Sequence, residues 1–337
     1  MLLSGSLVLA QNKKLSPYSF KVNFISPPNA DTFLSINIPS SYWNKDSSDR
    51  YETVHPSVIY NQDSLWGYQY WMAFTPYDAA SHENPCIVVS NDGNHWQEFV
   101  SKYSSDTLHN PLFNVSMVRN ALYLSDPDIL FDGDSSLWLV FRASFTHQID
   151  SLFVSQTKDG IHWSKKIGIM GGKASLISPS IIKDSTGKFS MWVVEDKPQP
   201  NKVLKYTSSR MDSGWTLADT CHWEASDVTN NDIWHIEVVP FGNNLLFGLV
   251  TELVHDRIGT KKLYLAVSRD GGDYWQTFDK PLLSPAENPA WDDKIIYRSS
   301  GVFIPDSTHI IMDLFYSACS RFNDKWHIGR TKVLFTR

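Results

Sequence analysis

The sequence predicts an all-β protein in which residues 51–337 form a five-bladed β-propeller. A polar strand-start pattern recurs five times, further β-rich runs follow each copy, and an Asp-Gly turn ending in Trp closes three of the copies. The sequence shows no long amphipathic helical pattern and no glycine-rich nucleotide loop, which disfavours an α/β fold. Radial repetition of three- or four-stranded antiparallel units accounts for this pattern.

Each repeat begins with a polar residue, a proline, a small or polar residue and then β-forming residues. The clear copies are HPSVIY (55–60), DPDILF (126–131) and SPSIIK (178–183), and the weaker ones are HIEVVP (235–240) and SSGVFI (299–304). The second runs are YWMAFTP (70–76), LWLVFRA (137–143), SMWVVED (190–196), LLFGLVTE (245–252) and IIMDLFYS (310–317). A third run follows in most copies, as in PCIVVS (85–90). We expect the first strand of each blade to line a central channel and the second to return beside it.

Three copies end in a related turn. It spans residues 90–96, 157–163 and 268–275, and each copy contains Asp-Gly before a tryptophan. Glycine accepts positive φ and aspartate bonds its own backbone, so Asp-Gly suits a tight turn between strands. We expect Trp96, Trp163 and Trp275 to anchor the outer strands by packing within or between blades.

The N-terminal 50 residues precede the first repeat. Residues 1–10, MLLSGSLVLA, are an apolar stretch with small residues near its end, typical of the remnant of an export signal. This stretch predicts a secreted or periplasmic protein. Residues 11–50 read as an extended, loop-rich arm that either packs on the first blade or completes the last one. No later segment reaches the ~18 apolar residues of a membrane span.

Composition limits the partners. A net charge of -6 disfavours nucleic acid, which usually leaves a basic footprint. The 13 Trp could fill a core or stack on sugar rings. The three cysteines, Cys86, Cys221 and Cys319, form neither a disulfide framework nor a metal cluster. We expect a monomer that needs no cofactor. The spacing of the candidate ligands does not require a metal, but a calcium ion in the channel stays an open alternative.

Charged residues recur at the start of the first strand and at the end of the second strand of several blades. These two positions lie close together because the second strand runs antiparallel to the first. Asp126 and Asp128 occupy alternate positions and should share one face of their strand. The alternative is that Asp126 caps a turn and Asp128 merely begins a solvated strand. The strand starts supply His55, Asp126, Asp128, His235, Glu237 and Arg298, and the strand ends supply Arg142, Glu195, Glu252 and Tyr316. We expect these side chains to gather in one pocket on a single face of the disc.

Paired carboxylates across a pocket suit the cleavage of a glycosidic bond. One acid protonates the leaving oxygen while the other activates water or attacks carbon. The expected catalytic acids are Asp126, Glu195, Glu252 and Glu237, and the expected substrate-binding residues are His55, Asp128, Arg142, His235, Arg298 and Tyr316.

Over residues 55–330 the chain resembles the five-bladed propeller glycoside hydrolases of families 43, 32 and 117. The resemblance rests on the DPDI strand start, the recurrent turns and the five-fold count. The turns also resemble the structural Asp-boxes of sialidase-type propellers, best at residues 268–275.

The resemblance implies catalytic acids at the starts of the first three blades. Asp126 matches the second position, but His55 and Ser178 occupy the first and third. A hydrolase would then draw its missing carboxylates from Glu195, Glu252 or Glu237. The predicted function is a glycoside hydrolase acting on a poly- or oligosaccharide, and the alternative is a glycan-binding propeller without catalysis.

Overall fold

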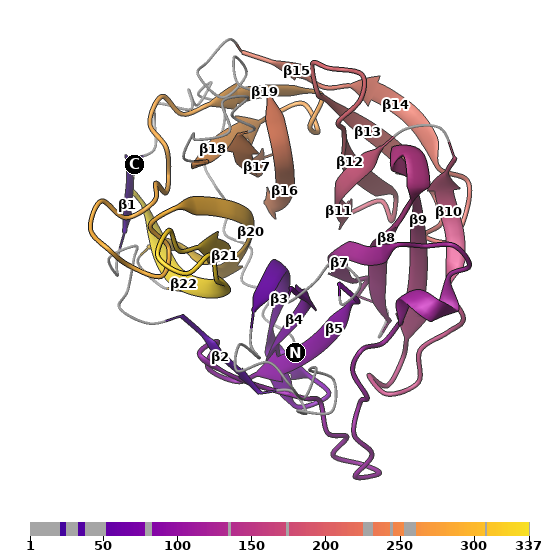
Figure 1. Cartoon of the computed structure of the whole chain (residues 1–337). Coiled ribbons are helices and arrows are strands. Elements are labelled where there is room, and N and C mark those ends of the chain that lie inside the picture. Colours follow the sequence, from indigo (N-terminus) through magenta and orange to yellow (C-terminus); the bar gives the residue numbers. More distant parts are fainter. Residues whose placement is uncertain are drawn as a thin grey trace, which may run out of the picture.

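Five sheets, antiparallel except for one added edge strand in each of two of them, surround one axis in the computed structural model, as predicted (Figure 1). The structure describes residues 21–24, 33–37, 52–77, 83–133, 136–172, 175–224, 232–242, 245–252, 261–306 and 309–336. The predicted export signal at residues 1–10 lies outside these ranges. None of the helices in the described ranges is long and apolar enough to cross a membrane.

The blades follow one another along the chain. The first contains β3 (Thr53–Leu65), β4 (Tyr68–Pro76), β5 (Cys86–Ser90) and β6 (His95–Gln97), and the second contains β7 (Tyr123–Phe131), β8 (Leu137–Phe145), β9 (Ile149–Thr157) and β10 (Ile167–Gly171). The third contains β11 (Leu176–Lys183), β12 (Phe189–Glu195), β13 (Lys202–Ser208) and β14 (Thr216–Thr220). The fourth contains β16 (Ile233–Phe241), β17 (Leu245–Glu252), β18 (Leu263–Ser268) and β19 (Tyr274–Thr277), and the fifth contains β20 (Ile295–Ile304), β21 (Ile310–Cys319) and β22 (Trp326–Thr336). The first strand of every blade faces the axis, so the predicted repeat is confirmed (Figure 1).

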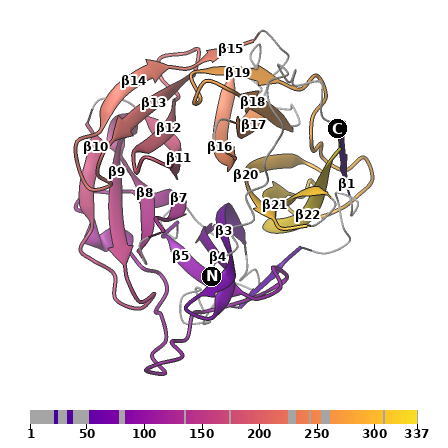
Figure 2. The ribbon, with the colours of Figure 1, turned by 180° about the vertical axis from the view of Figure 1, so that it is seen from behind.

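Strands from outside the five repeats complete three blades. β1 (Lys21–Phe24) pairs antiparallel with β22, and β2 (Ser35–Asn37) pairs parallel with β6. The N-terminal arm therefore does both things that the sequence left as alternatives, completing the last blade and packing on the first. β15 (His222–Trp223) likewise pairs parallel with β19. Each added strand covers a sheet edge whose backbone groups would otherwise be unpaired. Figure 1 labels β1 on blade 5 and β2 on blade 1, and Figure 2 shows β1 beside β22 from the other side.

The hydrophobic core lies between neighbouring blades. One cluster joins blades 1 and 2 through Trp71 and Phe141, and another joins blades 5 and 1 through Phe315 and Met72. The remaining three clusters join the other neighbouring pairs in the same way. Because each sheet buries both faces against its neighbours, the strands read as nearly continuous apolar runs.

Polar side chains join the innermost strands to one another around the channel. Each blade supplies one polar side chain from its first strand. The oxygen of that side chain accepts a hydrogen bond from a backbone N–H or a hydroxyl of the next blade. The backbone N–H of Ile129 donates to Ser57 Oγ (3.0 Å), that of Ile181 to Asp128 Oδ2 (2.7 Å), that of Val238 to Ser180 Oγ (2.8 Å) and that of Val58 to Ser300 Oγ (2.9 Å), while the Ser300 hydroxyl donates to Glu237 Oε1 (3.2 Å). Asp128 and Glu237 thus occupy positions that hold serine in the other three blades.

The predicted turn tryptophans are not equally buried. Trp96 and Trp275 are buried, and each donates its indole N–H to a turn carbonyl, Gly93 and Gly272 respectively, at 3.0 Å. Trp163 is only partly buried, and its indole nitrogen has no hydrogen-bond partner among the described residues. The prediction of a packed anchor is therefore confirmed for Trp96 and Trp275 but is only partly met by Trp163.

This difference predicts unequal stability effects. We expect Trp275→Ala to lower the free energy of unfolding by about 3–5 kcal/mol, because it empties a fully buried site between Trp192 and Trp223. Trp163→Ala should cost clearly less, since part of that ring already faces water. Urea unfolding of both variants measures the difference. Equal losses would show that solvent exposure does not distinguish the two turns.

Candidate active site

A β-bulge at the start of the innermost strands determines where the charged residues point. In β7 the pairing with β8 shifts between Ser125 and Asp128, and Asp126 adopts a positive φ of 48°. The matching residues of blades 1 and 3, His55 and Ser178, have φ of 57° and 54°. A bulge interrupts the alternation of side chains along a strand. The prediction that Asp126 and Asp128 share one face is therefore wrong.

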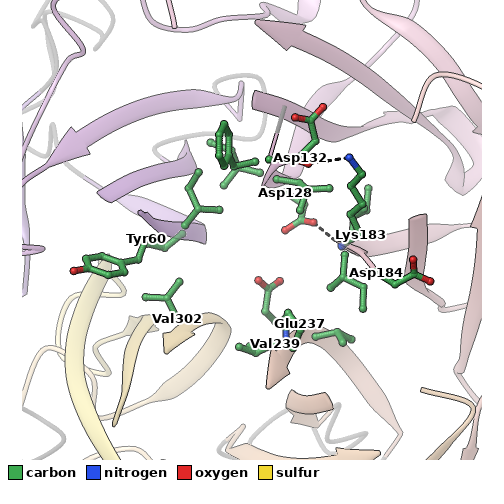
Figure 3. A pocket seen from close by; sticks show the side chains of 18 of the residues that line it. Tyr60, Asp128, Asp132, Lys183, Asp184, Glu237, Val239 and Val302 are labelled. Atoms are coloured by element: carbon green, nitrogen blue, oxygen red, sulfur yellow. Dashed lines mark hydrogen bonds between the residues drawn. The ribbon is translucent and has the colours of Figure 1, made fainter. Parts of the chain in front are cut away.

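The two aspartates line different cavities. The first, the strand-start cavity, has a volume of about 430 Å³ and is lined by residues at the beginnings of the innermost strands, including Asp126. The second, the strand-end cavity, has a volume of about 800 Å³ and is lined by later residues of the same strands, including Asp128 and Glu237. Figure 3 shows the carboxylates of Asp128 and Glu237 pointing toward one another within the strand-end cavity. The predicted single pocket is thus divided between the two mouths of the channel.

Arg298 lies between these two groups of acids and is fully buried. Its guanidinium nitrogens lie 3.8 Å from an Asp126 oxygen, 3.7 Å from Asp128 and 3.6 Å from Glu237. Burial raises the pKa of Asp128 to about 6 and that of Glu237 to about 8, although Arg298 opposes both shifts. Arg298 therefore acts as a shared counter-ion inside the channel.

Three side chains from different blades meet in the strand-start cavity. His55 Nε2 lies 3.4 Å from Asp126 Oδ1, and His235 Nδ1 lies 3.9 Å from the same oxygen. Their nearest ligand atoms all lie within 4.8 Å of one another, and all three residues are buried. We call this set the His-Asp-His cluster.

Neighbouring groups orient the cluster and set its charge. His55 Nδ1 hydrogen bonds to Thr75 Oγ1 at 2.8 Å, which directs Nε2 toward Asp126. Burial alone would raise the pKa of Asp126, but Arg142, 2.8 Å from Oδ2, outweighs it together with His55, His235 and Arg298, and the pKa lies well below its ordinary value. Burial lowers the pKa of His55 to about 4 and that of His235 well below its usual range. The cluster therefore combines an ionised carboxylate with two neutral imidazoles.

This donor set fits a divalent transition-metal ion. Two imidazoles and one carboxylate form a common protein site for such ions, and imidazole must be neutral to bind a metal. Asp126 Oδ1 and both His235 ring nitrogens are buried yet have no hydrogen-bond partner in the described ranges. Buried polar atoms are seldom left in this condition without a ligand. The sequence repeat placed these three residues at equivalent positions of blades 1, 2 and 4, but no ligand spacing within a short segment indicated a metal site.

Glu83, which the sequence analysis missed, also lines the strand-start cavity. Burial raises its pKa to about 8, with Arg142 opposing the shift and Asp126 adding to it. Glu83 is therefore protonated at neutral pH, next to a carboxylate that is not. It precedes β5 in a connection with no repeat signature, so the sequence offered no signal for it.

The raised pKa of Glu83 predicts a stability change with pH. In the unfolded chain Glu83 ionises near 4.5, but in the folded protein it keeps its proton to about 8, so its contribution to stability falls as pH rises between these values. We expect Glu83→Gln to gain stability relative to the parent from pH 5 to pH 8, by no more than about 4 kcal/mol. Denaturant unfolding at several pH values measures this. Parallel pH curves for the two proteins would contradict the assignment.

Aromatic residues and one lysine form another wall of the strand-start cavity, made by Trp234, Tyr297, Trp326, Tyr77 and Lys261. Trp234 Nε1 donates to the Tyr297 hydroxyl at 3.0 Å, and the Tyr297 ring meets the edge of His235 at 4.4 Å between centroids. Tyr297 was missed because the β20 bulge places it, rather than Arg298, at the position that His55 holds in blade 1. The repeat SSGVFI (299–304) would have to begin two residues earlier, at Tyr297, to place this residue at the position of His55.

The other predicted residues lie elsewhere. Glu195 lines neither cavity, whereas Asp196, the next residue, lines the strand-start cavity. Glu195 lies near Tyr206, whose pKa is raised mainly by burial and further by the Glu195 carboxylate. Tyr316 is buried against Trp291 and donates to Asp292 at 3.0 Å, away from both cavities. Glu252 is buried at the end of β17 and is not among the residues that line either cavity. Of the predicted set, His55, Asp126, Arg142 and His235 share the strand-start cavity.

The fold and this cavity together define a five-bladed β-propeller with a buried polar cavity at one mouth of its channel. No known family model matches the sequence. A curated relative, the A type blood N-acetyl-alpha-D-galactosamine deacetylase of Flavonifractor plautii, is 24% identical over a 371-residue alignment that covers 95% of this chain and 46% of the relative. The chain thus spans about half the length of that relative.

Two solved structures show the same fold. The N-acetylgalactosamine deacetylase from F. plautii, in complex with blood group B trisaccharide, has a TM-score of 0.75 and 21% identity, covering 92% of this chain and 95% of that chain. A thermostable family-43 glycoside hydrolase has a TM-score of 0.56 and 13% identity, covering 88% and 92% of the two chains. The predicted resemblance to five-bladed propellers of the glycoside hydrolases is confirmed at the level of fold.

Proposed function

We propose that this protein is a metal-dependent hydrolase that removes the acetyl group from an N-acetylated sugar of a glycan. The observation that carries the proposal is the His-Asp-His cluster, a buried donor set that opens into a cavity large enough for a sugar. The curated relative, which acts on N-acetylgalactosamine by its printed name, supports the choice of an amide bond.

The residues of the cavity suit amide hydrolysis. When bound, a divalent cation supplies Lewis-acid polarisation of a carbonyl and lowers the pKa of water. Arg142 keeps Asp126 ionised and turned so that Oδ1 remains available to a ligand. The oxygen of a water molecule bonds to the acetyl carbon as the C–N bond breaks; Glu83, which holds a proton at neutral pH, can give that proton to the leaving amine, and the proton released by the water restores it. The products are acetate and an amino sugar.

A glycosidase remains the second candidate, because the pKa values of Glu83 and Asp126 are pushed in opposite directions. Two carboxyl groups separated in this way can serve as acid and as base or nucleophile in glycosidic cleavage. This candidate keeps Asp126 from the sequence-based prediction and replaces Glu195 and Glu252 with Glu83. A secreted or periplasmic location and a monomeric state stay predictions in either case.

The test is to incubate the purified protein with a panel of N-acetylated and non-acetylated glycans and to measure acetate and new reducing ends separately. We expect acetate without chain cleavage, its loss after chelation and its return with an added divalent cation. Reducing ends that form after chelation would instead support the glycosidase. Affinity for a glycan without either product would support the non-catalytic alternative and contradict the proposal.

A further inference from the structure

Lys261 is a cation on the aromatic wall of the strand-start cavity. It lies two residues before β18, and its Nζ is 4.9 Å from the ring centroid of Trp234 and 5.3 Å from that of Tyr297. Aromatic faces attract a cation at such distances. The two rings therefore hold the ammonium group at the edge of the site where the sugar is proposed to bind.

Within the described part of the chain, no carboxylate lies within ion-pair distance of the Lys261 ammonium group. Arg142, the other cation that lines this cavity, pairs with Asp126 at 2.8 Å and with Asp150 at 3.3 Å. Burial lowers the pKa of Lys261 to about 8, and no acid opposes that shift. At pH 7 the ammonium group is therefore still mostly protonated, without a counter-ion.

A partly buried ammonium group without a counter-ion is costly, and ring faces recover only part of that cost. The acids that line the same cavity, Glu83, Asp126 and Asp196, do not come within ion-pair distance of it. An anionic oxygen supplied by a ligand would complete the site, because a charge-assisted hydrogen bond is stronger than one to a neutral hydroxyl.

We propose that Lys261 selects glycans that carry an anionic substituent, a carboxylate or a sulfate ester, on the sugar that occupies the strand-start cavity. Trp234 and Tyr297 fix the direction of the ammonium group toward that substituent. This inference rests on the proposed function only in placing a sugar in this cavity. It holds whether the reaction removes an acetyl group or cleaves a glycosidic bond.

The experiment measures affinity by calorimetry for matched neutral and anionic sugars, before and after chelation. The pairs are N-acetylgalactosamine with its 6-sulfate and methyl glucoside with methyl glucuronide. We expect the parent to bind at least one anionic member about tenfold or more tightly than its neutral partner. The ratio should approach one in Lys261→Met, persist in Lys261→Arg and shrink as salt is added.

The matched control is Lys205→Met. Lys205 also lies over a tryptophan, with Nζ 5.7 Å from the Trp192 ring, but it pairs with Asp273 and does not line the cavity. The control should keep the parent's ratio. Preference for only the sulfate or only the carboxylate identifies which anion is bound.

Equal affinity for neutral and anionic sugars in the parent, or no binding of any of them, would overturn the inference. So would a preference that survives in Lys261→Met, since the anion would then be bound elsewhere. These outcomes are independent of acetate release, so failure here is distinguishable from failure of the proposed deacetylation.

Discussion

Asp126→Asn is expected to lower turnover by at least ~100-fold while leaving the fold intact. Asparagine has nearly the same shape and tolerates the positive φ of 48° at this position. It loses the negative charge that the His-Asp-His cluster contributes to a cation. The affinity for that cation should fall by more than the ~10- to 100-fold typical of losing a residue that only orients a ligand.

The matched comparison is Glu195→Gln, because the sequence pattern assigned Glu195 a catalytic role and the structure places it outside both cavities. We expect Glu195→Gln to keep nearly full turnover. Initial rates on a substrate that the parent converts, together with metal content by mass spectrometry, measure both effects. If Glu195→Gln were inactive and Asp126→Asn active, the site would have to be sought elsewhere.

Arg298→Met is expected to lower the free energy of unfolding by about 3–5 kcal/mol, because it removes one partner of a buried ionic group. Arg298 is fully buried and lies within 4 Å of Asp126, Asp128 and Glu237. Methionine fills much of the volume but leaves these carboxylates without their shared cation.

The loss should depend on pH. Asp128 and Glu237 already have pKa values raised to about 6 and 8, and removing Arg298 raises both further. A raised folded-state pKa means stability that is lost as pH rises, so the variant should lie further below the parent at pH 8 than at pH 5.

The control for this variant is Arg210→Met, which breaks an exposed pair with Asp212 and should not shift the unfolding midpoint measurably. Urea unfolding at both pH values measures the two variants. Equal midpoints for Arg298→Met and the parent would show that the channel acids do not need this counter-ion.

The repeat architecture could be predicted because its signals are local. A strand start such as DPDILF, or an Asp-Gly turn before Trp275, requires only a few adjacent residues to adopt one conformation. Five such copies at regular intervals leave few folds that can bury their apolar strands. The position of Asp126 at a channel mouth followed from the same register.

The pairing of side chains within the site could not be predicted in this way. Regular strand alternation predicted that Asp126 and Asp128 share a face, because a bulge cannot be recognised in the sequence. In the structure a bulge between Ser125 and Asp128 directs the two side chains toward opposite mouths of the channel. A matching bulge in β20 places Tyr297 in the strand-start cavity, and Asp196 rather than Glu195 lines that cavity beyond the end of β12. Strand alternation is a reliable guide only while pairing is regular.

By itself, then, the sequence determined the all-β repeat, the five blades and the gathering of polar residues at the channel mouths, because adjacent residues encode strands and turns. Only the tertiary structure decided that His55, Asp126 and His235 bring their ligand atoms within 4.8 Å of one another, that Glu83 and Lys261 join them from connecting segments, and that Arg298 lies between the two groups of acids. These contacts join residues far apart in the chain, and the pKa values that define their chemistry arise from burial, which exists only once the blades have closed around the axis.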